Sequence, residues 1–164
     1  MDFIDAESQL REHHAGKRVL VVDDEPLNID VVILLLQRTG LRLDCASDGQ
    51  AAVARAQEAA YSIILMDIHM PVLNGIEATR RIRQLAGGEK IPIIAVTANG
   101  SAQARKECLS AGVNDFIIKP YKPEELFSTM LKRLESLLIA DGTGQQANQY
   151  LQRTESRGSD EFQF

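Results

Sequence analysis

The fold of this chain follows from the stretch Val19-Leu20-Val21-Val22-Asp23-Asp24-Glu25-Pro26. It begins with a run of valine and leucine, which is typical of a strand buried on both faces of a parallel sheet. Pro26 suits the first turn of a helix, where its missing N–H leaves no hydrogen bond unmade. The stretch therefore predicts a buried strand, an acidic turn and a helix in direct succession.

The same alternation of strand and helix recurs until about residue 139. We expect strands at Val19–Val22, Arg42–Ala46, Ser62–Met66, Ile91–Val96 and Asp115–Ile118. We expect helices at Pro26–Arg38, Asp48–Ala60, Gly75–Leu85, Ser101–Ala111 and Pro123–Ile139, with Asp48 and Ser101 as N-caps. Five such repeats predict an α/β fold in which a five-stranded parallel sheet carries helices on both faces.

The expected domain covers residues 17–139 and leaves a short segment on either side. Residues 1–16 are interpreted as a polar N-terminal extension with partial helical character, in which His13 and His14 are solvated. Residues 140–164 contain five glutamines and three glycines but few apolar residues, so we interpret them as a polar C-terminal tail or linker.

The composition is that of an ordinary globular domain, with 45% hydrophobic and 25% charged residues. A net charge of −5 argues against direct binding of nucleic acid. The longest strongly apolar run, Val31–Leu36, is too short to span a membrane. Acidic residues at Asp2, Asp5 and Glu7 are not compatible with a secretory signal peptide, so we expect a cytoplasmic protein.

Polar side chains follow four of the expected strands at the point where each strand ends. Asp23 and Asp24 follow the first strand, Asp67 the third, Thr97 the fourth and Lys119 the fifth. Because the carboxyl ends of parallel strands lie at one edge of a sheet, where ligands bind, these side chains should converge on one pocket.

Three carboxylates in one pocket repel one another unless a cation lies between them. A hard divalent cation with oxygen ligands meets this need, with Mg²⁺ as the first candidate and Mn²⁺ as the alternative. Thr97 and Lys119 remain as donors to an anion. The anion that fits beside Mg²⁺ is a phosphoryl group, so the pocket is interpreted as a phosphoryl-transfer site.

In these features the chain resembles the receiver domain of response regulators. The resemblance rests on Asp23-Asp24-Glu25, on Met66-Asp67-Ile68-His69-Met70-Pro71 with Gly75 beyond it, on Thr97-Ala98, and on Lys119-Pro120. It implies a flavodoxin-like, doubly wound fold with strand order 2-1-3-4-5. The form of the Asp67 motif resembles receivers attached to hybrid histidine kinases, so the chain is either such a receiver or a free-standing regulator.

The resemblance implies a role for each acidic residue. Asp67 would accept a phosphoryl group from a histidine kinase or a histidine phosphotransfer protein and form an aspartyl phosphate. Asp24 would hold Mg²⁺ directly, and Asp23 would hold it through water. The backbone carbonyl of His69 would be a further metal ligand.

The resemblance also implies how the phosphoryl group is held and sensed. Lys119 would pair with a phosphoryl oxygen, and the Lys119–Pro120 peptide bond would be cis. The Thr97 hydroxyl would move to the phosphoryl group while Phe116 turns inward. Because Phe116 lacks the hydroxyl of a tyrosine, this switch would depend on packing alone.

Two side chains beside the pocket are interpreted as controls on the lifetime of the phosphoryl group. His69 and Asn99 lie two residues beyond Asp67 and Thr97 and would tune self-dephosphorylation. Such a protein would catalyse only its own phosphorylation and dephosphorylation, and we therefore do not expect an enzyme. We expect a downstream protein partner whose identity the sequence leaves open, and either a monomer or a phosphorylation-dependent dimer.

The helix that follows Asp24 has apolar residues on two sides at about 100° per residue. The side expected to cover the sheet consists of Ile29, Val32, Ile33 and Leu36. The opposite stripe consists of Leu27, Val31 and Leu34, with Asn28 at its rim. This stripe either packs on a neighbouring helix or forms the docking surface for the phosphodonor, which we favour.

Other functions compatible with parts of this pattern stay open. A pseudo-receiver would serve as an interaction scaffold without taking phosphate, although such proteins generally lose one of the motif residues. A Mg²⁺-dependent aspartyl-phosphate phosphatase of the haloacid dehalogenase type would need a second aspartate where His69 stands. A flavodoxin-like flavin binder would need a hydroxyl- and glycine-rich loop where Asp23-Asp24-Glu25-Pro26 stands.

Overall fold

The computed structural model of the protein describes residues 3–140. The helices are α1 (Phe3–His13), α2 (Pro26–Leu36), α3 (Gly49–Glu58), α4 (Gly75–Gln84), α5 (Ala102–Ala111) and α6 (Pro123–Ala140), with the short 3₁₀ helices η1 (Gln37–Thr39) and η2 (Gly88–Lys90). The strands are β1 (Arg18–Val22), β2 (Arg42–Ala46), β3 (Ile63–Asp67), β4 (Ile93–Thr97) and β5 (Asp115–Ile118). The expected C-terminal tail, from residue 141 onward, lies outside the described residues.

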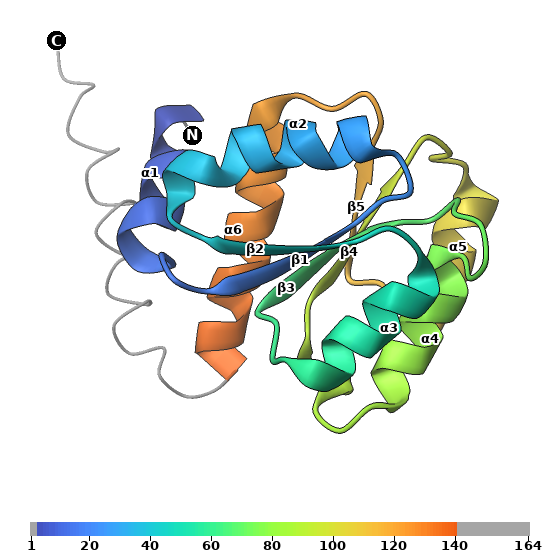
Figure 1. Ribbon diagram of the computed structural model, residues 1–164. Coiled ribbons are helices and arrows are strands. Elements are labelled where there is room, and N and C mark those ends of the chain that lie inside the picture. The colour runs from blue at the N-terminus through green and yellow to red at the C-terminus, as the bar shows by residue number, and fades with distance from the viewer. Residues whose placement is uncertain (1–2, 141–164) are drawn as a thin grey trace, which may run out of the picture.

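The five strands form one parallel sheet in the order β2-β1-β3-β4-β5, which confirms the expected topology. The register pairs Val22 at the end of β1 with Met66 near the end of β3. Figure 1 shows α1, α2 and α6 on one face of the sheet and α3, α4 and α5 on the other. The ends of β1 and β3 are therefore level with each other at the carboxyl edge of a doubly wound sheet.

Each face of the sheet has its own apolar core because successive strand residues point to opposite faces. Val19 and Val21 pack beneath α1, α2 and α6. Leu20 and Val22 pack against the helices of the other face. Strands β3 and β4 are buried along their whole length, and this double burial explains why their sequences are almost continuously apolar.

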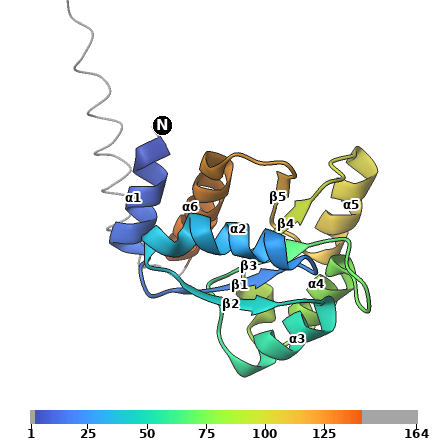
Figure 2. The ribbon, with the colours of Figure 1, turned by 45° about the horizontal axis from the view of Figure 1, so that its top comes forward.

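The N-terminal segment forms a helix that is part of the packed structure. Helix α1 packs against α6 and η1, and Figure 2 shows it alongside α6. Ala6, Leu10 and His14 lie four residues apart on one stripe, and all three are buried. The expected solvation of His14 is therefore wrong, because this stripe of mixed polarity faces the protein interior.

The buried imidazole of His14 has one close polar partner. Its Nδ1 atom lies 2.9 Å from Nζ of Lys17. The pKa of His14 is lowered to about 4, chiefly by burial and in addition by the positive charges of Lys17 and His13. The imidazole is therefore neutral at pH 7, and its Nδ1 accepts the hydrogen bond that the ammonium donates.

The local stop and start signals act largely as expected. Asp48 accepts a hydrogen bond from the backbone N–H of Ala51 at 2.7 Å, and Ser101 accepts one from Ala104 at 3.2 Å. Gly112 ends α5 with φ at 108°, a left-handed conformation that favours glycine. Strand β4 begins at Ile93, two residues later than expected, because the proline before it cannot donate to the ladder.

Helix α6 has the apolar spacing that its sequence predicts. Its buried residues are Leu126, Phe127, Met130, Leu131 and Leu134, and the side chain of Leu138 lies outside the described part. Polar residues such as Glu125, Ser128 and Lys132 are exposed on the other side, as in a helix that covers one face of a sheet. Within residues 3–140, none of the helices combines the length and the apolar character that crossing a bilayer requires.

Candidate functional site

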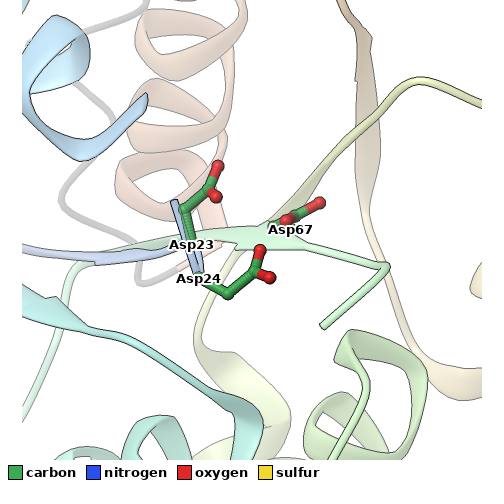
Figure 3. A group of neighbouring side chains, drawn as sticks. All are labelled: Asp23, Asp24 and Asp67. Carbon is green, nitrogen blue, oxygen red and sulfur yellow. The ribbon is translucent and has the colours of Figure 1, made fainter. Parts of the chain in front are cut away.

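Three carboxylates gather at the carboxyl edge of the sheet, as Figure 3 shows. Asp23 and Asp24 directly follow β1, and Asp67 is the last residue of the neighbouring strand β3. Asp23 and Asp67 are both 6% exposed, and Asp24 is partly buried. One carboxylate oxygen of each residue lies within 4.8 Å of the others. The structure thus brings together the acidic residues that the strand ends predict.

Lys119 extends from the end of β5 into this cluster. Its Nζ atom donates a hydrogen bond to Oδ2 of Asp23 at 3.0 Å and lies 3.6 Å from Oδ1 of Asp67. The peptide bond between Lys119 and Pro120 is cis, as the resemblance implies. The ammonium therefore bridges two of the three carboxylates, but its hydrogen bond is to Asp23.

Asp67 carries the strongest electrostatic conflict in the cluster. The pKa of its carboxyl is raised to about 6, chiefly by burial and in addition by the negative charges of Asp23 and Asp24. The nearby ammonium of Lys119 and a hydrogen bond from the backbone N–H of Ile68 act in the opposite direction. The folded protein therefore disfavours the ionised form of Asp67, chiefly because the carboxylate has lost water.

The charges of this cluster do not balance within the part of the chain that the structure describes. Three carboxylates share one ammonium, and that ammonium is already hydrogen-bonded to Asp23. A hard divalent cation with carboxylate ligands would offset the excess negative charge. The donor set and the spacing of its oxygens therefore fit one such cation.

Thr97 and Phe116 lie on neighbouring strands beside this cluster. The Thr97 hydroxyl is buried and accepts a hydrogen bond from the backbone N–H of Asn99 at 3.2 Å. The half-buried Phe116 ring lies under the guanidinium of Arg105, with 5.5 Å from Cζ to the ring centroid. Both residues line a cavity of about 70 Å³. The predicted switch pair therefore shares one small space next to Asp67.

His69 and Asn99 lie at the mouth of the same cavity. Both side chains are exposed, and both contribute to the lining alongside Thr97. His69 belongs to the loop after β3 and Asn99 to the loop after β4. The two side chains therefore come together at one cavity from two loops, and their role in dephosphorylation stays a prediction.

Helix α2 presents the predicted apolar stripe to the outside. Leu27, Val31 and Leu34 are 71%, 43% and 62% exposed. Ile33, which was expected to cover the sheet, is also exposed, whereas Leu35 packs against the core. The expectation for Ile33 is wrong because the buried face of α2 is centred on Val32 and Leu36, and the helix is turned toward Leu35.

Asn28 differs from the other residues of this stripe. It is half-buried, and its Nδ2 atom donates a hydrogen bond to Oδ1 of Asp23 at 3.3 Å. Asn28, Asp23 and Lys119 also line a largely apolar groove of about 600 Å³ between α2 and the segment that follows β5. The sequence reasoning missed this contact. The signal that could have found it is an amide in the first turn of the helix that follows the acidic pair.

Comparison with known proteins identifies relatives of this chain. Residues 19–131 match the family model of the response regulator receiver domain. The chain is 37% identical over 121 residues to the signal transduction histidine-protein kinase BarA of Escherichia coli, which covers 74% of this chain and 13% of BarA. It is 38% identical over 109 residues to the transcriptional regulatory protein ResD of Bacillus subtilis, which covers 66% of this chain and 44% of ResD. The chain thus spans less than half the length of either relative.

Solved structures show the same similarity. The receiver domain of sensor histidine kinase PA1611 from Pseudomonas aeruginosa, which has a magnesium ion coordinated in its active-site cleft, is 42% identical to this chain with a TM-score of 0.69. That match covers 73% of this chain and 98% of the PA1611 domain. The chemotaxis protein CheY4 of Vibrio cholerae is 32% identical with a TM-score of 0.69, and the match covers 72% of this chain and 98% of CheY4.

Proposed function

This chain belongs to the response regulator receiver domain family of two-component signalling, and from that premise we propose that it accepts a phosphoryl group from a phosphohistidine onto Asp67. The observation that carries the proposal is the position of Asp67. It is a buried carboxylate at a strand end, with two further carboxylates and the Lys119 ammonium beside it.

The proposed transfer exchanges one phosphorus bond for another. The N–P bond of the phosphohistidine breaks, and a carboxylate oxygen of Asp67 forms the new bond to phosphorus. The histidine nitrogen leaves with the electron pair of the broken bond and takes up a proton from solvent. The product is an aspartyl phosphate, and the free histidine is restored on the donor.

The residues around Asp67 support the transfer by holding charge in place. Asp23, Asp24, Asp67 and the backbone carbonyl of His69 would hold Mg²⁺, with Mn²⁺ as a substitute that takes the same ligands. Bound there, the cation would offset the negative charge of the phosphoryl oxygens. Lys119 already lies 3.6 Å from Oδ1 of Asp67 and would donate to a phosphoryl oxygen attached to it.

Phosphorylation would then shift an equilibrium between two arrangements of the surface formed by α5, β5 and α6. The Thr97 hydroxyl would turn from the N–H of Asn99 toward the phosphoryl group. Phe116 would move inward into the small cavity that both residues line. This surface would control a downstream protein, as a monomer or as a phosphorylation-dependent dimer.

The proposed phosphodonor is a histidine kinase or a histidine phosphotransfer protein in the cytoplasm. The phosphodonor would dock on the exposed stripe of this chain's helix α2, which consists of Leu27, Val31 and Leu34 and lies next to the acidic cluster. The protein would act on itself alone and would have no other substrate. Val31→Asp should therefore slow transfer from the protein donor while leaving labelling by a small phosphodonor unchanged.

The proposal is tested with acetyl phosphate and Mg²⁺, followed by intact mass spectrometry. Wild-type protein should gain one phosphoryl unit, and Asp67→Asn should gain none. Asp24→Ala should label much more slowly because it removes a proposed metal ligand. Asp30→Asn, which changes an exposed aspartate of α2, is the matched control and should label like wild type.

Other outcomes would assign a different function. Absence of labelling in wild type at saturating Mg²⁺ would favour a pseudo-receiver that serves as a scaffold. Continuous hydrolysis of a phosphate monoester that is not a phosphodonor for receivers would favour a phosphatase, because self-dephosphorylation alone also releases phosphate from acetyl phosphate. An undiminished mass gain in Asp67→Asn would show that the phosphoacceptor lies elsewhere.

A further inference from the structure

The carboxylate of Asp23 is held at both of its oxygens. Oδ1 accepts hydrogen bonds from the backbone N–H of Glu25 at 3.0 Å and from Nδ2 of Asn28 at 3.3 Å. Oδ2 accepts from Nζ of Lys119 at 3.0 Å. The orientation of this carboxylate is therefore set jointly by the start of α2 and by the loop after β5.

The hydrogen bond from Asn28 limits rotation of the Asp23 carboxylate. A terminal carboxylate has a broad torsional preference, so a second donor on the same oxygen narrows the angles that it populates. If Oδ1 turned away, Oδ2 would turn with it, and Lys119 would follow its partner. Lys119 would then leave its position 3.6 Å from Asp67.

The chemistry of the amide suits this position. An amide donates a hydrogen bond without bringing a charge into a site that already holds three carboxylates. A carboxylate of the same shape would only accept, and it would face Asp23 with a like charge. An aliphatic side chain of the same shape would leave Oδ1 with the backbone donor of Glu25 alone.

We propose that Asn28 is a positioning residue for phosphoryl transfer: it holds Asp23 so that the acidic cluster fits its divalent cation and Lys119 stays beside Asp67. This inference rests on the proposed function, and it replaces the interpretation of Asn28 as a rim residue of the docking stripe. Asn28 acts through Asp23 and touches neither the phosphodonor nor the phosphoryl group.

The experiment compares Asn28→Leu and Asn28→Asp with wild type in two independent measurements. The first is the Mg²⁺ concentration that gives half of the maximal rate of Asp67 labelling by acetyl phosphate. The second is the rise in Tm that Mg²⁺ causes in the absence of any phosphodonor. Asn28→Gln retains the amide donor, and Asp30→Asn is the matched control on the same helix.

We expect both Asn28→Leu and Asn28→Asp to need about tenfold more Mg²⁺, the order expected for losing one hydrogen bond to a charged group. The rise in Tm with Mg²⁺ should shrink in parallel. The Tm without Mg²⁺ should change little in Asn28→Leu, and Asn28→Gln should recover part of the Mg²⁺ response. Asp30→Asn should match wild type in both measurements.

Two results would overturn the inference. One is an unchanged Mg²⁺ requirement and an unchanged rise in Tm in both Asn28→Leu and Asn28→Asp. The other is slower labelling only when a histidine phosphotransfer protein is the donor, which would return Asn28 to the docking surface. Failure of wild type to label at Asp67 would instead contradict the proposed function, and the Mg²⁺-dependent Tm would still test Asn28.

Discussion

Buried charged side chains at the two edges of the sheet differ in how well hydrogen bonds compensate their charge. Near the amino edge, Arg83 extends from α4 and donates to four acceptors: the carbonyl oxygens of Gly88, Ile91 and Gly112 and the side chain of Asn114. At the carboxyl edge, Asp67 is buried beside two like charges, with an ammonium 3.6 Å away. Burial opposes the charge at both places, but among the described residues Arg83 donates hydrogen bonds to four acceptors, whereas Asp67 accepts one from the backbone N–H of Ile68.

The difference separates a structural charge from a functional one. The guanidinium of Arg83 links α4 to the segments that lead into β4 and β5. These hydrogen bonds offset the free-energy cost of removing the guanidinium from water. The carboxylate of Asp67 is compensated only in part by the Ile68 N–H and the Lys119 ammonium. We expect a cation at this site to offset the remaining cost. Buried charges with incomplete partners are therefore the better guide to the site.

The largest effect is expected at the structural edge. Arg83→Met should lower the free energy of unfolding by about 4 kcal/mol, because three partly buried carbonyl oxygens lose their donor together. Urea denaturation measures this loss, with Arg81→Met on the same helix as an exposed control. A loss below about 1 kcal/mol would mean that Arg83 does not hold these segments together.

A smaller effect is expected from His14, also near the amino edge. Its pKa falls from 6.5 to about 4 on folding, so the unfolded chain binds a proton more readily between these values. Stability from the neutral imidazole is therefore complete above pH 6.5 and is lost as the pH falls toward 4. The loss should approach about 3 kcal/mol, at about 1.4 kcal/mol for each pKa unit.

This contribution is measured as the difference in unfolding free energy between wild type and His14→Gln across that pH range. His13→Gln, which changes the neighbouring and more exposed imidazole, serves as the control. Equal pH dependence in wild type and His14→Gln would contradict a buried neutral imidazole at this position.

The smallest effect has the opposite sign and lies at the carboxyl edge. Folding raises the pKa of Asp67 to about 6, so the folded protein binds this proton more tightly than the unfolded chain does. Its contribution to stability is therefore present below about pH 4 and is lost as the pH rises through 6. At pH 7 without Mg²⁺, Asp67→Asn should be about 1 to 2 kcal/mol more stable than wild type.

Added Mg²⁺ should reverse this order, because it would stabilise wild type and leave Asp67→Asn nearly unchanged. Thermal unfolding of both proteins with and without Mg²⁺ measures the reversal. If Asp67→Asn were less stable than wild type without the cation, the ionised carboxylate of Asp67 would not be the unfavourable charge that we infer at the carboxyl edge.

Much of the fold and of the acidic cluster can be predicted from the sequence, because each site residue directly follows an apolar run that predicts a strand. The apolar runs before Asp23, Asp67 and Thr97 are short and rich in β-branched residues, which is typical of strands buried on both faces, and parallel pairing brings their ends together. The caps at Asp48 and Ser101 follow from local hydrogen bonds alone. These features need no knowledge of distant packing.

The features that the sequence did not predict depend on how helices pack. The exposure of Ile33 follows from the rotation of α2 on the sheet, which the apolar residues all around that helix leave undetermined. The burial of His14 follows from α1 packing on α6, across more than one hundred residues of chain. The contact of Asn28 with Asp23 likewise depends on the angle at which α2 leaves the acidic turn.

The most direct test of the account locates the phosphoryl group on the chain. Wild-type protein treated with acetyl phosphate and Mg²⁺ is reduced with borohydride, which converts an aspartyl phosphate to homoserine, and is then mapped by peptide mass spectrometry. We expect homoserine at the position of Asp67, with Asp23 and Asp24 unmodified. Homoserine at either of those two positions, or at none of the three in a protein that has gained a phosphoryl unit, would contradict this expectation.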